Sequence, residues 1–151
     1  MAKGVFEVPV DLAPGLSGSI EAEIYEKGGV APTYVIRTNQ HWYVDIKWEL
    51  NGQIVPMICG EWCIHLYMES IGPGEELKLH DYDGPYHLHL DPCGNGKYHY
   101  HLDVDEHTVK AEHCSTPYKL VVAITYLNAC HKPGPIAGFV ELPMVQFYEA
   151  S

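Results

Sequence analysis

The stretch from residue 41 to residue 52, HWYVDIKWELNG, decides the fold class. Between residues 41 and 50 polar and apolar residues alternate. The odd-numbered residues are mostly polar, and the even-numbered residues are apolar, namely Trp42, Val44, Ile46, Trp48 and Leu50. Successive side chains of a β-strand point to opposite faces of the sheet, so the pattern predicts a strand with one buried face. Asn51-Gly52 is a preferred two-residue hairpin turn, and we expect it to return the chain through residues 53–58 as a second strand.

The same alternation recurs along the chain, at residues 20–24, 64–68 and 118–126. Turns rich in Gly and Pro separate these segments, and apolar residues do not recur at helical spacing over any long window. We therefore expect an all-β protein with a single β domain over residues 1–151. This pattern predicts an antiparallel β-sandwich of about eight or nine strands, and a closed β-barrel is the alternative.

Composition limits the classes of partner and the compartment. The 151 residues carry 20 Asp and Glu against nine Lys and Arg, a formal net charge of −11 at pH 7, which opposes binding to nucleic acid and to anionic membranes. No apolar run approaches the roughly 20 residues of a membrane-spanning helix. The residues before Glu7 form no apolar signal sequence, and five cysteines are an odd number without regular spacing. We expect a cytoplasmic protein with reduced thiols.

Histidine is concentrated in two neighbouring segments, YHLHLD at residues 86–91 and YHYHLDVD at residues 98–105. Each segment alternates as a strand does, so its polar residues share one face. The first segment contributes His87, His89 and Asp91 to that face. The second contributes His99, His101, Asp103 and Asp105.

A turn centred on Gly94 would make these segments a hairpin in which His89 faces His99 and His87 faces His101. Residues opposite each other in such a pair have Cβ atoms about 4.5 to 5.5 Å apart, so the four imidazoles could converge on a divalent metal ion. Zinc, copper and nickel are the metals that suit imidazole ligands. The expected metal ligands are His87, His89, His99 and His101. The residues expected to orient them or to line an interface are Asp91, Asp103, Asp105 and His107.

Several functions remain open at this point. The leading hypothesis is a non-enzymatic, acidic binding module that uses the histidine hairpin as its recognition face and self-associates into a homo-oligomer. One alternative is a small metalloenzyme in which three of the four histidines hold a metal with an open position for water. Another is a structural oligomer subunit with a pH-sensitive histidine interface, because protonation of all ten histidines would bring the charge from −11 to −1. The same residues also fit a plain solvent face. The sequence identifies no small-molecule ligand.

Overall fold

The computed structural model describes residues 2–12, 14–72, 76–79, 86–90, 95–112 and 115–149. Its described part contains eleven strands, more than the eight or nine expected. The strands are β1 Ala2–Glu7, β2 Ser17–Glu26, β3 Val35–Arg37, β4 Trp42–Asn51, β5 Gly60–Ser70, β6 Glu76–Leu79, β7 Tyr86–Leu90, β8 Lys97–Val104, β9 Ser115–Leu127, β10 Pro133–Glu141 and β11 Val145–Tyr148. The helical structure in these residues is the 3-10 turn η1, Val55–Met57. None of the described helical structure is long and apolar enough to cross a membrane.

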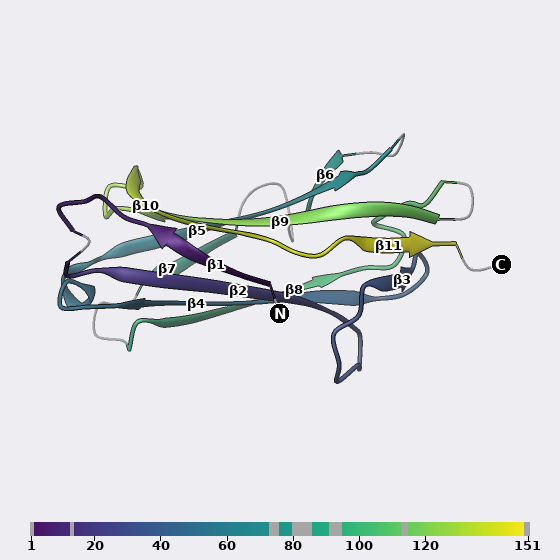
Figure 1. Ribbon diagram of the computed structural model, residues 1–151, viewed down its shortest axis with the longest axis horizontal. Helices are drawn as coiled ribbons and strands as arrows, with labels where there is room; N and C mark the ends of the chain where they lie inside the picture. Colours follow the sequence, from purple (N-terminus) through teal and green to yellow (C-terminus); the bar gives the residue numbers. More distant parts are fainter. Residues whose placement is uncertain are drawn as a thin grey trace.

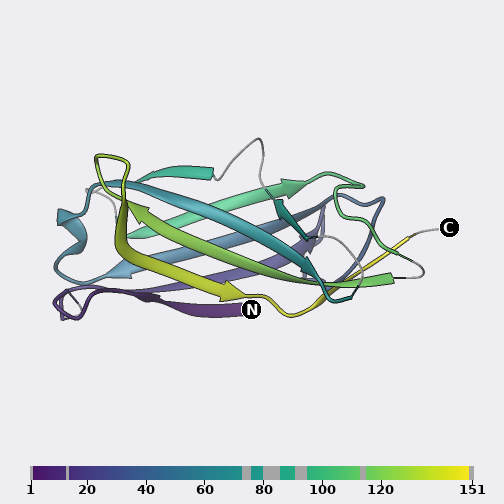
Figure 2. The same cartoon turned by 90° about the horizontal axis from the view of Figure 1, so that it is seen from above.

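The strands form a β-sandwich, as expected (Figure 1). Strands β2, β4 and β8 make one layer, called layer A here, and β5, β9, β10 and β11 lie in the other, layer B, in which β5 also pairs with β6 and β7. In both layers the strands run roughly along the long axis of the molecule (Figure 2). Strand β1 joins the layers, because residues 2–5 pair with β2 and residues 6–7 pair with β10.

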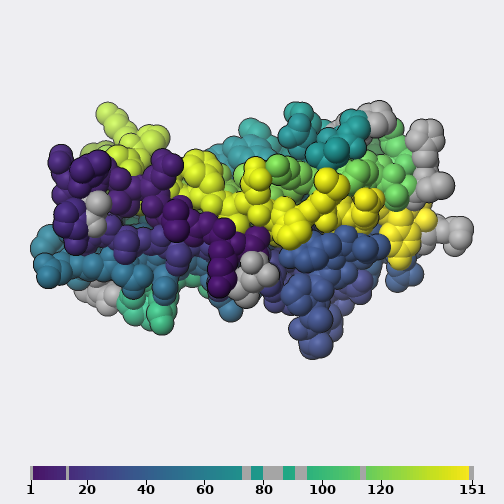
Figure 3. Space-filling model, viewed as in Figure 1, coloured from purple at the N-terminus to yellow at the C-terminus, as the bar shows by residue number. Residues whose placement is uncertain are grey.

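The sheet is open and almost entirely antiparallel. Its main path runs β3-β11-β9-β10-β1-β2-β4-β8, and the two end strands do not pair with each other in the described part of the chain. The closed-barrel alternative is therefore wrong. The β3–β11 pair is parallel, unlike the other ladders. In the space-filling view the C-terminal segment, coloured yellow, lies directly against the blue segment that contains β3, and it closes this side of the sandwich (Figure 3).

The core lies between the layers and follows the alternation read from the sequence. All five apolar even positions of β4 are at most 3% exposed, which confirms the predicted strand and its buried face. Layer B supplies Trp62, Ile64, Leu66 and Met68 from β5 and a matching row from β9. Trp62 is fully buried, and its ring packs against Phe6, Trp48, Tyr98 and Tyr126.

The predicted hairpin after Asn51-Gly52 is wrong. Residues 53–58 do not form a strand; they contain η1, and β4 pairs instead with β2 and β8. Proline provides the reason, since Pro56 has no amide hydrogen to give to a ladder and its fixed φ suits the first turn of a helix. Gly52 makes the turn with φ of +123°, and it lies so close to Gly15 that a side chain would meet the Gly15 carbonyl oxygen.

The predicted histidine hairpin is also wrong, although both of its segments are strands. Strand β7 pairs with β5, so His87 lies opposite Cys63, whereas β8 pairs with β4, so His101 lies opposite Asp45. The chain crosses from layer B to layer A between the two strands. Alternation sets which face of a strand is buried, but it is satisfied equally well in either layer of a sandwich. The histidines of the two strands therefore lie on opposite outer faces.

Candidate functional site

The outer surface of layer A is the first candidate site, and we call it the histidine face. It consists of outward residues of three neighbouring strands, which lie side by side in register. One row of the register joins Glu23, Asp45 and His101 across β2, β4 and β8. The neighbouring rows are Glu21, Lys47 and His99 on one side and Tyr25, Tyr43 and Asp103 on the other.

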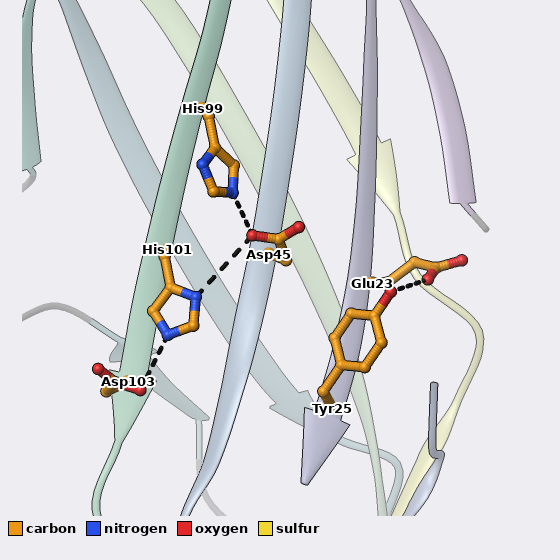
Figure 4. Close-up of polar contacts among 6 residues, drawn as sticks. All are labelled: Glu23, Tyr25, Asp45, His99, His101 and Asp103. Atoms are coloured by element: carbon orange, nitrogen blue, oxygen red, sulfur yellow. Dashed lines mark hydrogen bonds and ion pairs between the residues drawn. The ribbon is translucent and has the colours of Figure 1, made fainter. Parts of the chain in front are cut away.

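Asp45 is the centre of the histidine face (Figure 4). One of its oxygens, Oδ1, contacts Nε2 of His99 and lies 3.9 Å from Nδ1 of His101. The second ring nitrogen of His101, Nε2, lies 3.0 Å from Oδ1 of Asp103. The side chain of Asp45 is 22% exposed and that of Asp103 is 75% exposed. The His101 ring therefore lies between the carboxylates of Asp45 and Asp103.

Two tyrosines extend this cluster across the sheet. The ring of Tyr43 stacks on His101 with centroids 4.3 Å apart, and Tyr25 stacks on Tyr43 at 5.1 Å. The Tyr25 hydroxyl donates a hydrogen bond of 2.6 Å to Oε2 of Glu23. This bond lowers the pKa of the Glu23 carboxyl, and together with burial it raises the pKa of Tyr25 to about 12. The result is a continuous row of stacked rings with a fixed carboxylate at its end.

A shallow depression of about 390 Å³ adjoins the cluster on the histidine face. It is lined by Ser19, Glu21, Lys47, Trp48, Glu49, Lys97, Tyr98 and His99. Charges of both signs surround it, and His99 is shared with the Asp45 cluster. The polar groups of this face thus line an open surface, which suits contact with another macromolecule better than enclosure of a small substrate.

The outer surface of layer B carries a second cluster, which we call the thiol–histidine face. On β5, Sγ of Cys63 lies 3.3 Å from Nε2 of His65. On β7, Nδ1 of His87 lies 2.9 Å from Oε2 of Glu61. The other oxygen of Glu61 is 3.7 Å from Nδ1 of His131, which follows β9. Residues of three segments therefore meet at one end of β5.

The Cys63–His65 pair does not have the electrostatics of an activated nucleophile. Burial raises the pKa of the Cys63 thiol, and the negative charge of Glu61 raises it further. Burial, followed by Lys78 and His87, lowers the pKa of His65. Both shifts favour the neutral pair over a thiolate–imidazolium pair, because desolvation disfavours charged forms. The hydrogen bond to His87 lowers the pKa of Glu61, which stays ionised beside them.

The predicted metal ligands therefore fall into two pairs. His87 and His89 lie on the thiol–histidine face, and His99 and His101 lie on the histidine face, so no three of the four share a surface. As the side chains stand, the described residues include no group of three or more His, Cys, Asp or Glu that could hold a metal ion.

The remaining predicted site residues have different outcomes. Asp103 belongs to the Asp45 cluster through its contact with His101, and Asp105 lies 3.6 Å from His41 just after β8. His107 lies in the following turn with φ of +64°, and its amide binds the Thr38 carbonyl oxygen, away from the cluster. The prediction for Asp91 lies outside the described residues.

Sequence reasoning missed the partners that organise both faces, namely Asp45 and Tyr43 on β4 and Glu61, Cys63 and His65 on β5. The alternation of residues 41–50 already placed Asp45 on the polar side of its strand. The sequence did not indicate that β4 pairs with β8. This pairing joins residues more than 50 positions apart and brings His99 to Asp45.

Comparisons of the chain with protein-family models, with curated proteins and with solved structures give no match.

Proposed function

We propose that this protein is a non-enzymatic interaction module whose partner is a second copy of itself, docked through strand β8 and the histidine face. The observation that carries the proposal is that His99, His101 and Asp103 of the Asp45 cluster lie on an edge strand, β8. Strand β8 pairs with β4, and its other edge has no partner among the described strands. Its eight residues include no proline, and an unpaired edge of this kind is a template for strand addition.

The charges of β8 and of Asp105, the residue that follows it, are self-complementary about His101. Two copies related by a two-fold axis at this residue would pair β8 with β8 in antiparallel register, so residues equally distant from position 101 face each other. Lys97 then lies opposite Asp105 of the partner copy, and His99 lies opposite Asp103 of the partner copy. Each ion pair forms twice. The inward residues remain apolar across the junction, with Tyr100 opposite a partner leucine.

Protons should strengthen this association. His99 contacts Asp45 and faces Lys47 across the strand pair, and His101 lies among Asp45, Asp103 and the ring of Tyr43. Protonated His99 attracts Asp103 of the other copy. Protonation throughout the chain also reduces the charge of −11 that makes two copies repel each other. The two protonated copies of His101 at the axis would repel each other and weaken the association. The carboxylates beside each His101 reduce this repulsion.

The first test is the oligomeric state as a function of pH. Sedimentation velocity of the full chain at pH 7.5 and pH 5.5 should show a dimer at both, with a dissociation constant at least about tenfold lower at pH 5.5, a difference of about 1.4 kcal/mol. A monomer at both pH values would overturn the proposal.

Charge reversal tests the register. Lys97→Glu and Asp105→Lys should each weaken the dimer, because each places like charges opposite one another. The double variant restores opposite charges and should recover the affinity. Loss of the His41–Asp105 contact contributes little, since that pair is exposed. Failure of the double variant to recover would show that β8 does not pair in this register.

A further inference from the structure

The thiol–histidine face holds two groups at the spacing of metal ligands. A zinc ion binds cysteine sulfur at about 2.3 Å and imidazole nitrogen at about 2.0 to 2.1 Å, so a tetrahedral angle separates the two donor atoms by about 3.5 Å. The Cys63 Sγ and His65 Nε2 atoms are 3.3 Å apart. Both side chains project from the same side of β5, because they are two residues apart on one strand.

His87 is placed to provide a third ligand. It lies directly opposite Cys63 in the β5–β7 ladder, where Cβ atoms of facing residues are about 4.5 to 5.5 Å apart. Its Nδ1 atom is held by Glu61 at 2.9 Å, which leaves Nε2 available. A carboxylate on one ring nitrogen is the usual support of a histidine that binds metal through the other nitrogen. Glu61 is also within 3.7 Å of His131.

We propose that Cys63, His65 and His87 bind one zinc ion, with Glu61 orienting His87 and water in the fourth position. His87 must turn its Nε2 toward Cys63 for all three donors to meet. The Cys63 thiol then loses its proton to solvent as the zinc–sulfur bond forms. A thiolate with two imidazoles suits zinc and copper and excludes the hard cations calcium and magnesium.

This site is independent of the self-association proposed above, because the two lie on opposite outer faces of the sandwich. It also differs from the four-histidine site expected from the sequence, and His87 is the residue that the two sites share. The neutral thiol–imidazole pair described above is thus the metal-free form of a binding site.

Metal titration of the untagged, metal-free full chain tests the proposal. Zinc added in competition with a chromophoric chelator should bind at one ion per chain and release one thiol proton. Cobalt(II), used as a spectroscopic probe, should give a near-ultraviolet sulfur-to-cobalt charge-transfer band. Cys63→Ser should abolish the band and weaken zinc binding about 100-fold or more. Glu61→Gln should weaken it about 10- to 100-fold and keep the band, as expected for a residue that orients a ligand.

Two variants serve as controls. Cys59→Ser removes an exposed thiol close to β5, and His99→Ala removes a histidine of the opposite face; neither should change the band or the affinity. Circular dichroism establishes that each variant is folded. Cobalt binding without the sulfur band, wild-type affinity in Cys63→Ser or in His87→Ala, or loss of the band in Cys59→Ser would each overturn the assignment.

Discussion

Asp45 shows how a single residue can organise a surface that no local motif reveals. Its carboxylate is reached by two histidines of the adjacent strand, and it shares a row of the register with Glu23 on the other side. Each contact depends on strand pairing rather than on neighbours in sequence. The carboxylates of Glu23 and Asp45 face each other in this row, and each has a side-chain partner: the Tyr25 hydroxyl donates a hydrogen bond to Glu23, and His99 contacts Asp45.

The Tyr25–Glu23 hydrogen bond should contribute a stability that depends on pH at both ends of the scale. Tyr25→Phe removes a bond to a carboxylate and should lower the free energy of unfolding by about 1 to 2 kcal/mol at neutral pH. The pKa of Glu23 is lowered in the folded state, so the contribution is present above its ordinary pKa and is lost as pH falls through the folded value. The pKa of Tyr25 is raised from 10.0 to about 12, so the contribution is complete below pH 10 and is lost as pH rises through 12.

Urea unfolding of the wild type and of Tyr25→Phe between pH 3 and pH 11 measures this difference. Tyr67→Phe is the matched control, because Tyr67 lies on layer B and its ring contacts with His65 and Lys78 remain in the variant. A difference for Tyr25→Phe that stays constant as the solution is acidified would show that the hydrogen bond does not depend on the ionised carboxylate.

At the scale of elements, the sequence predicts strands well and their partners poorly. The alternation in residues 41–50 and in the two histidine segments correctly assigned both the strands and their buried faces. Both predicted hairpins failed, because a turn signal indicates only that a strand ends. After Gly52 the chain enters η1, and between β7 and β8 it passes to the other layer. The four histidines predicted as metal ligands therefore lie on two outer faces, because their convergence required that pairing.

The turn that ends β4 gives a prediction about backbone conformation. Gly52 has φ of +123°, and a Cβ atom there would lie 2.1 Å from the Gly15 carbonyl oxygen. Gly28 also has positive φ, +80°, but a Cβ atom there would meet nothing within 4 Å. Gly28→Ala should therefore lower the free energy of unfolding by only about 1 kcal/mol, through backbone strain. Gly52→Ala should lower it by at least about 2 kcal/mol more, because its turn must move.

Thermal and urea unfolding of the two alanine variants provides the comparison. The variants share the same chemical change and a positive φ, so the difference between them reports the clash with residue 15 together with the greater backbone strain at φ of +123° than at +80°. Equal losses of stability would mean that the contact between Gly52 and Gly15 relaxes without cost.

At the scale of the whole molecule, the two layers are tied together by aromatic packing. Trp62 comes from layer B and contacts Trp48 and Tyr98 of layer A, and Phe6 of the joining strand packs on the same ring. Apolar strand faces cannot be left in water, so each layer depends on the other for its stability. The sequence predicted this sandwich because its alternation requires two buried faces, and the arrangement of layers needed no knowledge of individual pairings.

Trp62 is the position at which this dependence is most directly tested. Trp62→Ala should lower the free energy of unfolding by about 3 to 5 kcal/mol, because it leaves a large cavity between the layers. Trp62→Phe should cost no more than about half as much. It keeps an aromatic ring, and it removes an indole N–H that is buried without an acceptor among the described residues. Urea unfolding followed by both circular dichroism and fluorescence of the remaining tryptophans should give coincident transitions for each variant. If the two probes separated in Trp62→Ala, or if the alanine and phenylalanine variants lost equal stability, the layers would not be coupled through this ring.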